Sequence, residues 1–191
     1  NFRSIHRLNF EKYVNYKFDI LINCSMPSKR FWAKQNPKKD YMETVEKTSF
    51  FLKNYKFNKF IHISTVSARC EKNTVYGKNK KISEELIKKT KDYLIVRFAA
   101  MYGKGLIKGV LIDMLNNSKV YVNGQSKYSF TDVAWNAKWI VDNLNSKEKL
   151  VEIGTTDYIE LDQLARLINS TSRFDGEMDD QIILNKSYKF D

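Results

Sequence analysis

The stretch from residue 60 to residue 98 most constrains what this chain can fold into. Residues 60–66 form an apolar run that is rich in β-branched side chains and too short for a helix. Apolar residues then recur at helical spacing over 82–87, and residues 93–98 are again strand-like. A strand, a helix and a second buried strand make a βαβ unit, which predicts an α/β protein with a parallel sheet.

Four side chains with useful chemistry fall at one edge of that predicted sheet. Ser64 and Thr65 end the first strand, while Tyr76 and Lys80 lie in the first turns of the helix. In open parallel sheets, ligands bind beyond the carboxyl ends of the strands. We therefore expect a binding site at this edge.

The spacing of Tyr76 and Lys80 suggests proton transfer. Residues four apart share a helix face, so the Lys80 ammonium is expected near the Tyr76 phenol. A free phenol has a pKa of about 10, and a neighbouring cation lowers it. Thr65 could hydrogen-bond the same substrate oxygen. Such a site suits alcohol–ketone chemistry, with the hydride left to a nicotinamide.

The same spacing occurs elsewhere, because the chain is rich in tyrosine and lysine. It recurs at Tyr13 with Lys17 and at Tyr55 with Lys59, and any one match also fits a solvated basic face. Only Tyr76 follows a strand that ends in hydroxyls and begins a helix that leads into another strand. This context favours Tyr76 over the other two.

Three motifs in this order, HISTVSA, YGKNK and LIVRFAAMYGKG, resemble the core of the extended short-chain dehydrogenase/reductases, the NAD-dependent nucleotide-sugar epimerase/dehydratase family. The resemblance runs from about Phe18 to the C-terminus. It implies a Rossmann-like parallel sheet flanked by helices, with a small C-terminal substrate lobe. Residues 1–103 would form the NAD(P)-binding domain, and 104–191 would form mainly the lobe, with some segments returning to the core.

The resemblance also implies roles for individual residues. The expected catalytic residues are Tyr76, Lys80 and Thr65. Residues expected at the NAD or NADP cofactor are Cys24, Ser25, Met26, Ser64, Lys80 and Ala100. The expected substrate-binding residues are Ser67 and Lys127. These roles describe an NAD(P)-dependent nucleotide-sugar epimerase or reductase; the alternative is a catalytically inactive relative that binds a nucleotide or a protein partner.

The chain departs from the family pattern in several places. Thr44 stands where the family usually carries asparagine, and Val66 and Ser67 stand where dehydratases carry an acidic pair, which disfavours 4,6-dehydration. No glycine-rich phosphate loop follows an early strand. Residues 103–109 hold three glycines at the wrong spacing and predict a turn into the lobe. The resemblance places the missing loop upstream of Asn1, either outside this chain as given or absent from the protein.

Hydrophobic periodicity and turn residues predict the remaining elements. Strands are expected over residues 18–25, 119–122 and 151–154. Helices are expected over residues 41–52, 110–115, 130–145 and 161–169, the third with Asp132 as its N-cap or as an acidic residue of its first turn.

Composition narrows the function classes. The net charge of +11 suits phosphate-bearing ligands, but the lysines are dispersed among glutamates, so we expect no nucleic-acid partner. Two cysteines, Cys24 and Cys70, are too few for a disulfide framework and suggest a reducing, cytoplasmic compartment. We expect no membrane span and no metal site, with His62 as a hydrogen-bonded core residue. A homodimer is possible.

Overall fold

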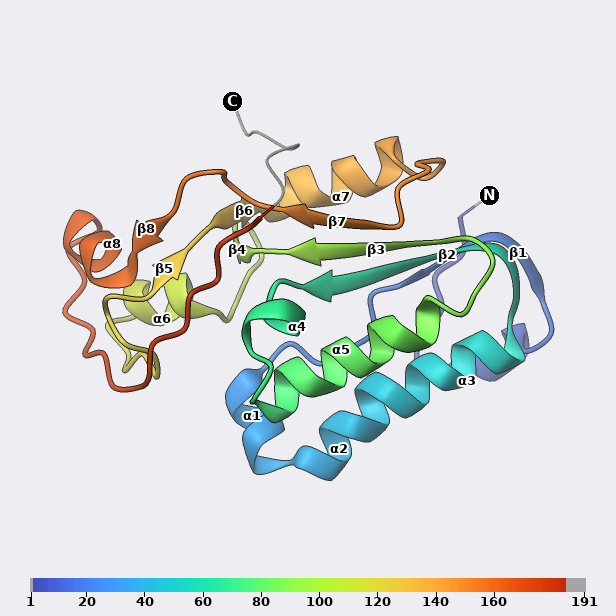
Figure 1. Cartoon of the computed structure of the whole chain (residues 1–191), viewed down its shortest axis with the longest axis horizontal. Coiled ribbons are helices and arrows are strands. Elements are labelled where there is room, and N and C mark those ends of the chain that lie inside the picture. The colour runs from blue at the N-terminus through green and yellow to red at the C-terminus, as the bar shows by residue number, and fades with distance from the viewer. Residues whose placement is uncertain (1, 185–191) are drawn as a thin grey trace.

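The main sheet of the computed structural model, which describes residues 2–184, has four parallel strands (Figure 1). Their order is β1-β2-β3-β7. The strands are β1 Lys17–Asn23, β2 Lys56–Thr65, β3 Tyr93–Phe98 and β7 Leu150–Ile153. The register sets Ile61 beside Ile22 on one side and Leu94 on the other. The predicted α/β, Rossmann-like fold is confirmed.

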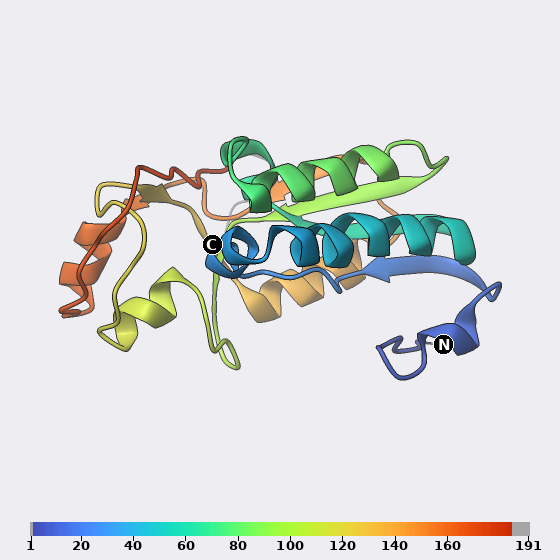
Figure 2. The same cartoon turned by 90° about the horizontal axis from the view of Figure 1, so that it is seen from below.

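Helices cover both faces of this sheet (Figure 2). On one face, α7 (Val133–Asp142) packs Trp139 and Ile140 against the strands. On the other face, α3 (Lys47–Asn54) and α5 (Val75–Ile87) cover a second apolar cluster that includes Ile87. Each fully buried aliphatic side chain stabilises the fold by about 1.5–3 kcal/mol. The sheet is therefore a rigid base for residues at its carboxyl edge.

The start of α5 is fixed by a cap and by a close contact. The Thr74 hydroxyl accepts a hydrogen bond from the Gly77 amide at 2.9 Å, as an N-cap does. A Cβ on Gly77 would lie 2.0 Å from the carbonyl oxygen of Glu71, so only glycine fits there. Glu71 itself follows the short helix α4 (Ser67–Cys70). These contacts hold the first turns of α5 against the end of β2.

The helix predicted over residues 41–52 lies in a longer, irregular helical segment. It begins with α2 (Pro37–Tyr41), passes through a π-helical turn, η2 (Met42–Glu46), and continues as α3. Two short helices precede it, η1 (Phe10–Tyr13) and α1 (Arg30–Gln35). A π-turn inserts an extra residue and often marks a functional site.

The remaining elements form a smaller lobe beside the sheet. It contains the parallel pair β4 (Ala100–Tyr102) and β6 (Phe130–Asp132), and the antiparallel pair β5 (Lys127–Tyr128) and β8 (Ile159–Glu160). Helices α6 (Val110–Leu115) and α8 (Leu161–Leu167) pack on them. The domain boundary after residue 103 stays a prediction, and residues 185–191 of the predicted lobe lie outside the described part.

Two predicted elements of the lobe are wrong in part. Residues 119–122 form no strand, because only Val120 bridges to Phe174. The helix predicted from Phe130 begins at Val133, since residues 130–132 pair with β4 instead. Of the two roles predicted for Asp132, the structure shows the N-cap, since its side chain accepts from the Trp135 amide at 2.8 Å. The three glycines of residues 103–109 all have positive φ, which confirms a turn there.

His62 lies in the core, as predicted. Its ring is fully buried and contacts the Asn23 amide at 3.3 Å and the Ser83 hydroxyl at 3.2 Å. Burial lowers the pKa of His62 to about 3, so the ring is neutral. Within residues 2–184, no group of three or more potential metal ligands comes together. Over the same range, no helix combines the length and apolarity that crossing a bilayer requires.

Candidate active site

The three residues predicted to be catalytic meet at the carboxyl edge of the sheet. The Lys80 Nζ lies 5.1 Å from the centroid of the Tyr76 ring, one turn along α5. Thr65, the last residue of β2, lies close enough to the Tyr76 phenol for its hydroxyl to lower the pKa of that phenol. The local sequence explains this arrangement, because Thr65 at the strand end and Tyr76 in the first turn of the capped helix are only eleven positions apart.

The electrostatics of Tyr76 differ from the expectation. Burial raises the pKa of the phenol above its ordinary value, since only 6% of the residue is exposed. Among the charged groups that lower this pKa, Arg30 acts most strongly. The prediction that Lys80 makes this phenol acidic is therefore wrong for this structure, in which desolvation is the largest effect.

Lys80 is a buried lysine with few partners. Its Nζ donates to the carbonyl oxygen of Pro27 at 2.7 Å. Burial lowers the pKa of Lys80 to about 7, although the carboxylate of Asp40 opposes this shift. An ammonium has three N–H donors, so donors remain for a ligand. Asp40 is also buried and accepts from the Asn79 amide at 2.8 Å.

The residues predicted to bind the cofactor divide into two groups. Ser25 and Met26 follow β1 near this edge, where Ser25 donates to Asn23 Oδ1 at 2.9 Å and the Met26 sulfur lies 3.7 Å from the Ser83 hydroxyl. Cys24 is exposed beside them.

Ser64 and Ala100 have surroundings of a different kind. The Ser64 hydroxyl donates to the buried carboxylate of Glu84 at 2.7 Å, so this hydroxyl is part of the buried polar network. Ala100 lies on β4 and packs into the apolar cluster of the lobe. The described contacts of these two residues are therefore with Glu84 and with the apolar cluster of the lobe, and not with Tyr76 or Lys80.

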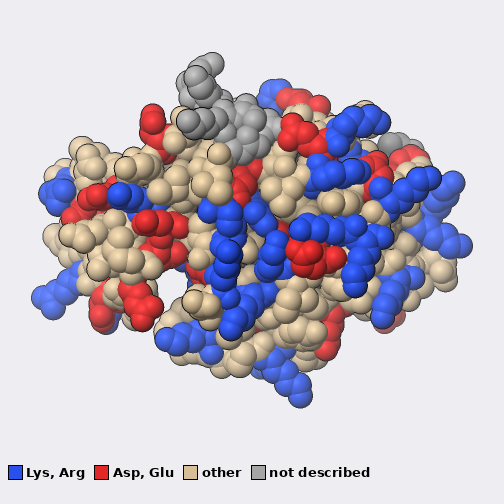
Figure 3. Space-filling model, in the orientation of Figure 1, with Lys and Arg blue, Asp and Glu red and all other residues tan. Residues whose placement is uncertain are grey.

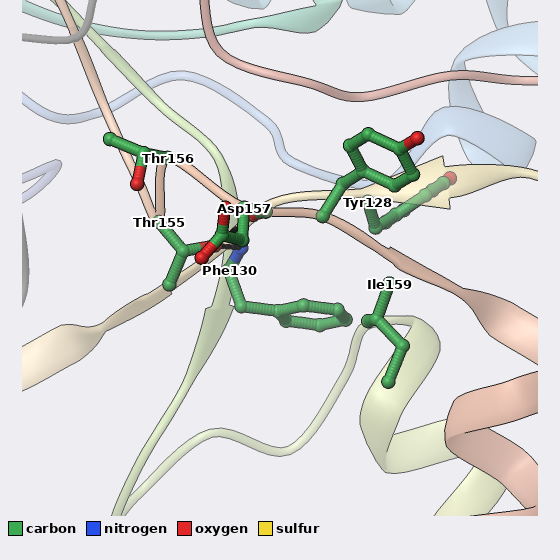
Figure 4. Close-up of a pocket in the computed structure, with 7 residues that line it drawn as sticks. Tyr128, Phe130, Thr155, Thr156, Asp157 and Ile159 are labelled. Carbon is green, nitrogen blue, oxygen red and sulfur yellow. Dashed lines mark hydrogen bonds between the residues drawn. The ribbon is translucent and has the colours of Figure 1, made fainter.

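The two predicted substrate-binding residues are also separated. Ser67 lies next to the site, and the Thr65 hydroxyl contacts its Oγ at 3.3 Å. Lys127 lies on β5, and its ammonium is 5.1 Å from the centroid of the Tyr158 ring. Tyr158 lines a cavity of about 300 Å³ in the lobe, where the Phe130 ring reaches toward Ile159 (Figure 4). Tyr76 is not among the residues that line this cavity.

A polar cluster that the sequence did not predict lies at the junction of the lobe and the sheet. Arg30 donates to Glu71 at 2.7 Å and to the Tyr128 hydroxyl at 2.8 Å, and it pairs with Asp179. Gln181 joins the cluster through Glu71 and Ser67. These residues come from separate segments, up to 149 positions apart. The spacing of residues in the sequence therefore does not predict the cluster.

Charge on the visible face is uneven. Lysine and arginine side chains gather over the half that carries α3, α5 and the main sheet, with carboxylates among them (Figure 3). The mixture matches the dispersed lysines of the sequence. It provides a positive surface without a single basic stripe on this face.

Comparison with known proteins shows a likeness of fold. No protein-family model matches the chain, and no curated protein matches it in sequence. Among solved structures, dTDP-glucose 4,6-dehydratase from Streptomyces venezuelae with NAD bound is similar at a TM-score of 0.75 and 15% identity, over 91% of this chain and 64% of that one.

Two epimerases are similar to the same degree. UDP-glucuronic acid 4-epimerase from Bacillus cereus, in complex with UDP-glucuronic acid and NAD, gives a TM-score of 0.70 at 18% identity, over 86% of this chain and 64% of that one. UDP-glucose 4-epimerase from Thermotoga maritima, with UDP-glucose, gives 0.71 at 18% identity, over 88% and 69%. The chain thus has the fold of NAD-dependent nucleotide-sugar epimerases and dehydratases, and it spans about two thirds of their length.

Proposed function

We propose that this chain carries the proton-transfer site of an NAD(P)-dependent nucleotide-sugar epimerase or reductase. One observation carries the proposal: the Thr65 hydroxyl and the Lys80 amino group both lie near one buried phenol, that of Tyr76, at the carboxyl edge of a parallel sheet. Perturbed titratable groups at such an edge are typical of active sites. The fold shared with nucleotide-sugar enzymes supports the substrate class.

Each residue has a distinct task in this proposal. Tyr76 exchanges a proton with a sugar hydroxyl, and Thr65 holds the oxygen of that hydroxyl. Lys80 holds positive charge beside the phenol and offers its spare donors to the ribose of the cofactor. The bound nicotinamide supplies hydride transfer.

The described residues fit only one end of the cofactor. Cys24, Ser25 and Met26 are small or unbranched and directly precede Pro27, whose carbonyl oxygen accepts from Lys80, which suits the nicotinamide ribose. The sequence contains no glycine-rich loop at a helix start that would hold the diphosphate. The chain's own residues therefore account for orientation and proton transfer.

Tyr76→Phe tests the proposal, with UDP-glucose and UDP-glucuronic acid as substrates and NAD or NADP added. We expect turnover to fall by roughly 100-fold or more, because the proton donor is lost, while binding measured by calorimetry is retained. Tyr13→Phe is the matched control, since Tyr13 also precedes a lysine by four positions. Unchanged turnover in Tyr76→Phe would refute the enzyme function.

A catalytically inactive relative is the second candidate, and one observation favours it. Burial holds the Tyr76 phenol protonated, which opposes its use as a base. This candidate predicts that the natural sequence binds a nucleotide or a protein partner without turnover. Calorimetry with UDP and NAD, run beside the turnover assay, separates the two candidates.

The homodimer and the cytoplasmic location belong to this proposal as well. Sedimentation of the purified chain measures its association directly. A reducing compartment agrees with Cys24 and Cys70, which are both free thiols.

A further inference from the structure

We propose that Gln181 is a positioning residue for the Thr65 hydroxyl and acts on it through Ser67. The inference rests on the proposed function and extends it to the C-terminal segment of the lobe. A residue that touches neither substrate nor cofactor would then set the geometry of the proton-transfer site.

The side chain of Gln181 reaches the site through a continuous path of hydrogen bonds. Its Oε1 accepts from the Ser67 hydroxyl at 3.0 Å. The Ser67 amide in turn donates to Thr65 Oγ1 at 3.2 Å, and the Thr65 hydroxyl contacts Ser67 Oγ at 3.3 Å. Only 2% of Gln181 is exposed, so no water replaces these contacts freely.

The other end of Gln181 is anchored in the lobe. Its backbone amide donates to the carbonyl oxygen of Lys127 at 2.8 Å, and its carbonyl accepts from Ser129 at 3.1 Å. Its side-chain Nε2 donates to Glu71 at 3.1 Å and also to Asp179. Both carboxylates bind Arg30, which adds a further link between α1 and the lobe.

An amide is the side chain that this position requires. The Ser67 hydroxyl needs an acceptor on one side, while two carboxylates need donors on the other. Glutamate would place a third carboxylate beside Glu71 and Asp179, and an apolar side chain would remove one hydrogen-bond partner from each of the three groups. Gln181 therefore couples the lobe to the end of β2, where Thr65 lies.

A double-variant experiment tests whether Gln181 acts through Thr65. In the full chain, with UDP-glucose and NAD, Gln181→Met should lower kcat roughly ten- to 100-fold with KM little changed, because Thr65 is misplaced. In a Thr65→Ala background, Gln181→Met should lower kcat no further. Losses that multiply in the double variant would overturn the proposal. Gln163→Met, on the exposed face of α8, is the control.

Hydrogen exchange supplies a test that needs no turnover. The amides of Arg69 and Cys70 bond to the Val66 carbonyl in α4, directly beside Ser67. Gln181→Met should speed their exchange while Gln163→Met leaves it unchanged, and equal rates in both variants would overturn the proposal. If Gln181→Met does not fold, Gln181→Asn keeps the amide but shortens its reach and serves instead.

The proposed function and this inference fail in different ways. Full turnover in Tyr76→Phe would remove the enzyme function. If Tyr76→Phe has no turnover, but the losses of kcat in Gln181→Met and Thr65→Ala multiply in the double variant, only the proposed role of Gln181 is refuted.

Discussion

Lys80 and Glu84 lie one turn apart on the same helix and are both buried, yet their surroundings differ. Lys80 is 3% exposed and donates to one carbonyl oxygen, that of Pro27. Glu84 is fully buried and accepts from Ser64 at 2.7 Å and from both ends of the Arg97 guanidinium, at 2.8 and 2.6 Å. The charge of Lys80 is therefore incompletely paired, whereas the charge of Glu84 is fully paired.

The difference separates a group that holds the fold from a group that can react. Arg97 also bonds Glu152 at 3.1 Å, and Glu152 bonds Arg69 at 2.8 Å, so the Glu84 end of α5 is tied to β3, β7 and α4. Such a network fixes geometry, since each member is satisfied. A buried lysine with spare donors costs stability, and costs of this kind concentrate at functional sites.

Breaking the paired end should give the largest effect on stability. Arg97→Met leaves Glu84 and Glu152 buried without their shared cation, which costs about 3–5 kcal/mol in the free energy of unfolding. Urea denaturation measures it. Lys138→Met removes an exposed pair with Asp142 and should cost less than about 1 kcal/mol. An equal loss in the free energy of unfolding in the two variants would show that the buried network stabilises the fold no more than an exposed ion pair does.

Replacing Lys80, the incompletely paired group, should raise the free energy of unfolding, by an amount that depends on pH. The pKa of Lys80 is about 7 when folded, below its ordinary value of 10.5. Between these values the unfolded chain binds the proton more tightly, so the natural sequence gains stability as pH rises, by up to about 1.4 kcal/mol per pH unit. Lys80→Met should lack this slope. Its gain in stability over the natural sequence should therefore be largest at pH 7 and below.

Denaturation from pH 6 to pH 10 checks this prediction. Lys78→Met, at an exposed position of the same helix, should keep the slope of the natural sequence. The same slope in Lys80→Met and the natural sequence would show that folding does not lower the pKa of Lys80.

The contrast along α5 also shows what sequence analysis could predict. The strands of the main sheet were predictable, because each is a short apolar run bounded by polar residues. The approach of Tyr76 and Lys80 was predictable, because it depends only on helical spacing. The pKa of Tyr76 was not, since its direction depends on burial by segments distant in the sequence.

The lobe was harder to predict than the sheet. Its strands span two or three residues, too few to show an alternating pattern. Its contacts with the site run through Gln181, which pairs with residues 114 and 110 positions away. Long-range polar contacts leave no periodic trace in a sequence, so Arg30, Glu71 and Asp179 could be found only in the folded chain.

The smallest predicted effect concerns two threonines on the helix that packs beside α5. Thr44 lies in the π-helical turn, is fully buried, and its hydroxyl has no hydrogen-bond partner among the described residues. Thr48, four positions later, donates to the Thr44 carbonyl at 2.7 Å and contacts the Asn23 amide at 3.4 Å.

Replacing each hydroxyl by a methyl group should therefore act in opposite directions. Thr44→Val should leave the free energy of unfolding unchanged or raise it by up to about 1 kcal/mol, since an unpaired polar atom is removed. Thr48→Val should lower it by roughly 1 kcal/mol, because a satisfied bond is lost and Asn23 loses a partner. Thermal unfolding at neutral pH compares the two. A loss in Thr44→Val as large as that in Thr48→Val would mean that the Thr44 hydroxyl binds a polar partner in the folded protein, and it would contradict the prediction.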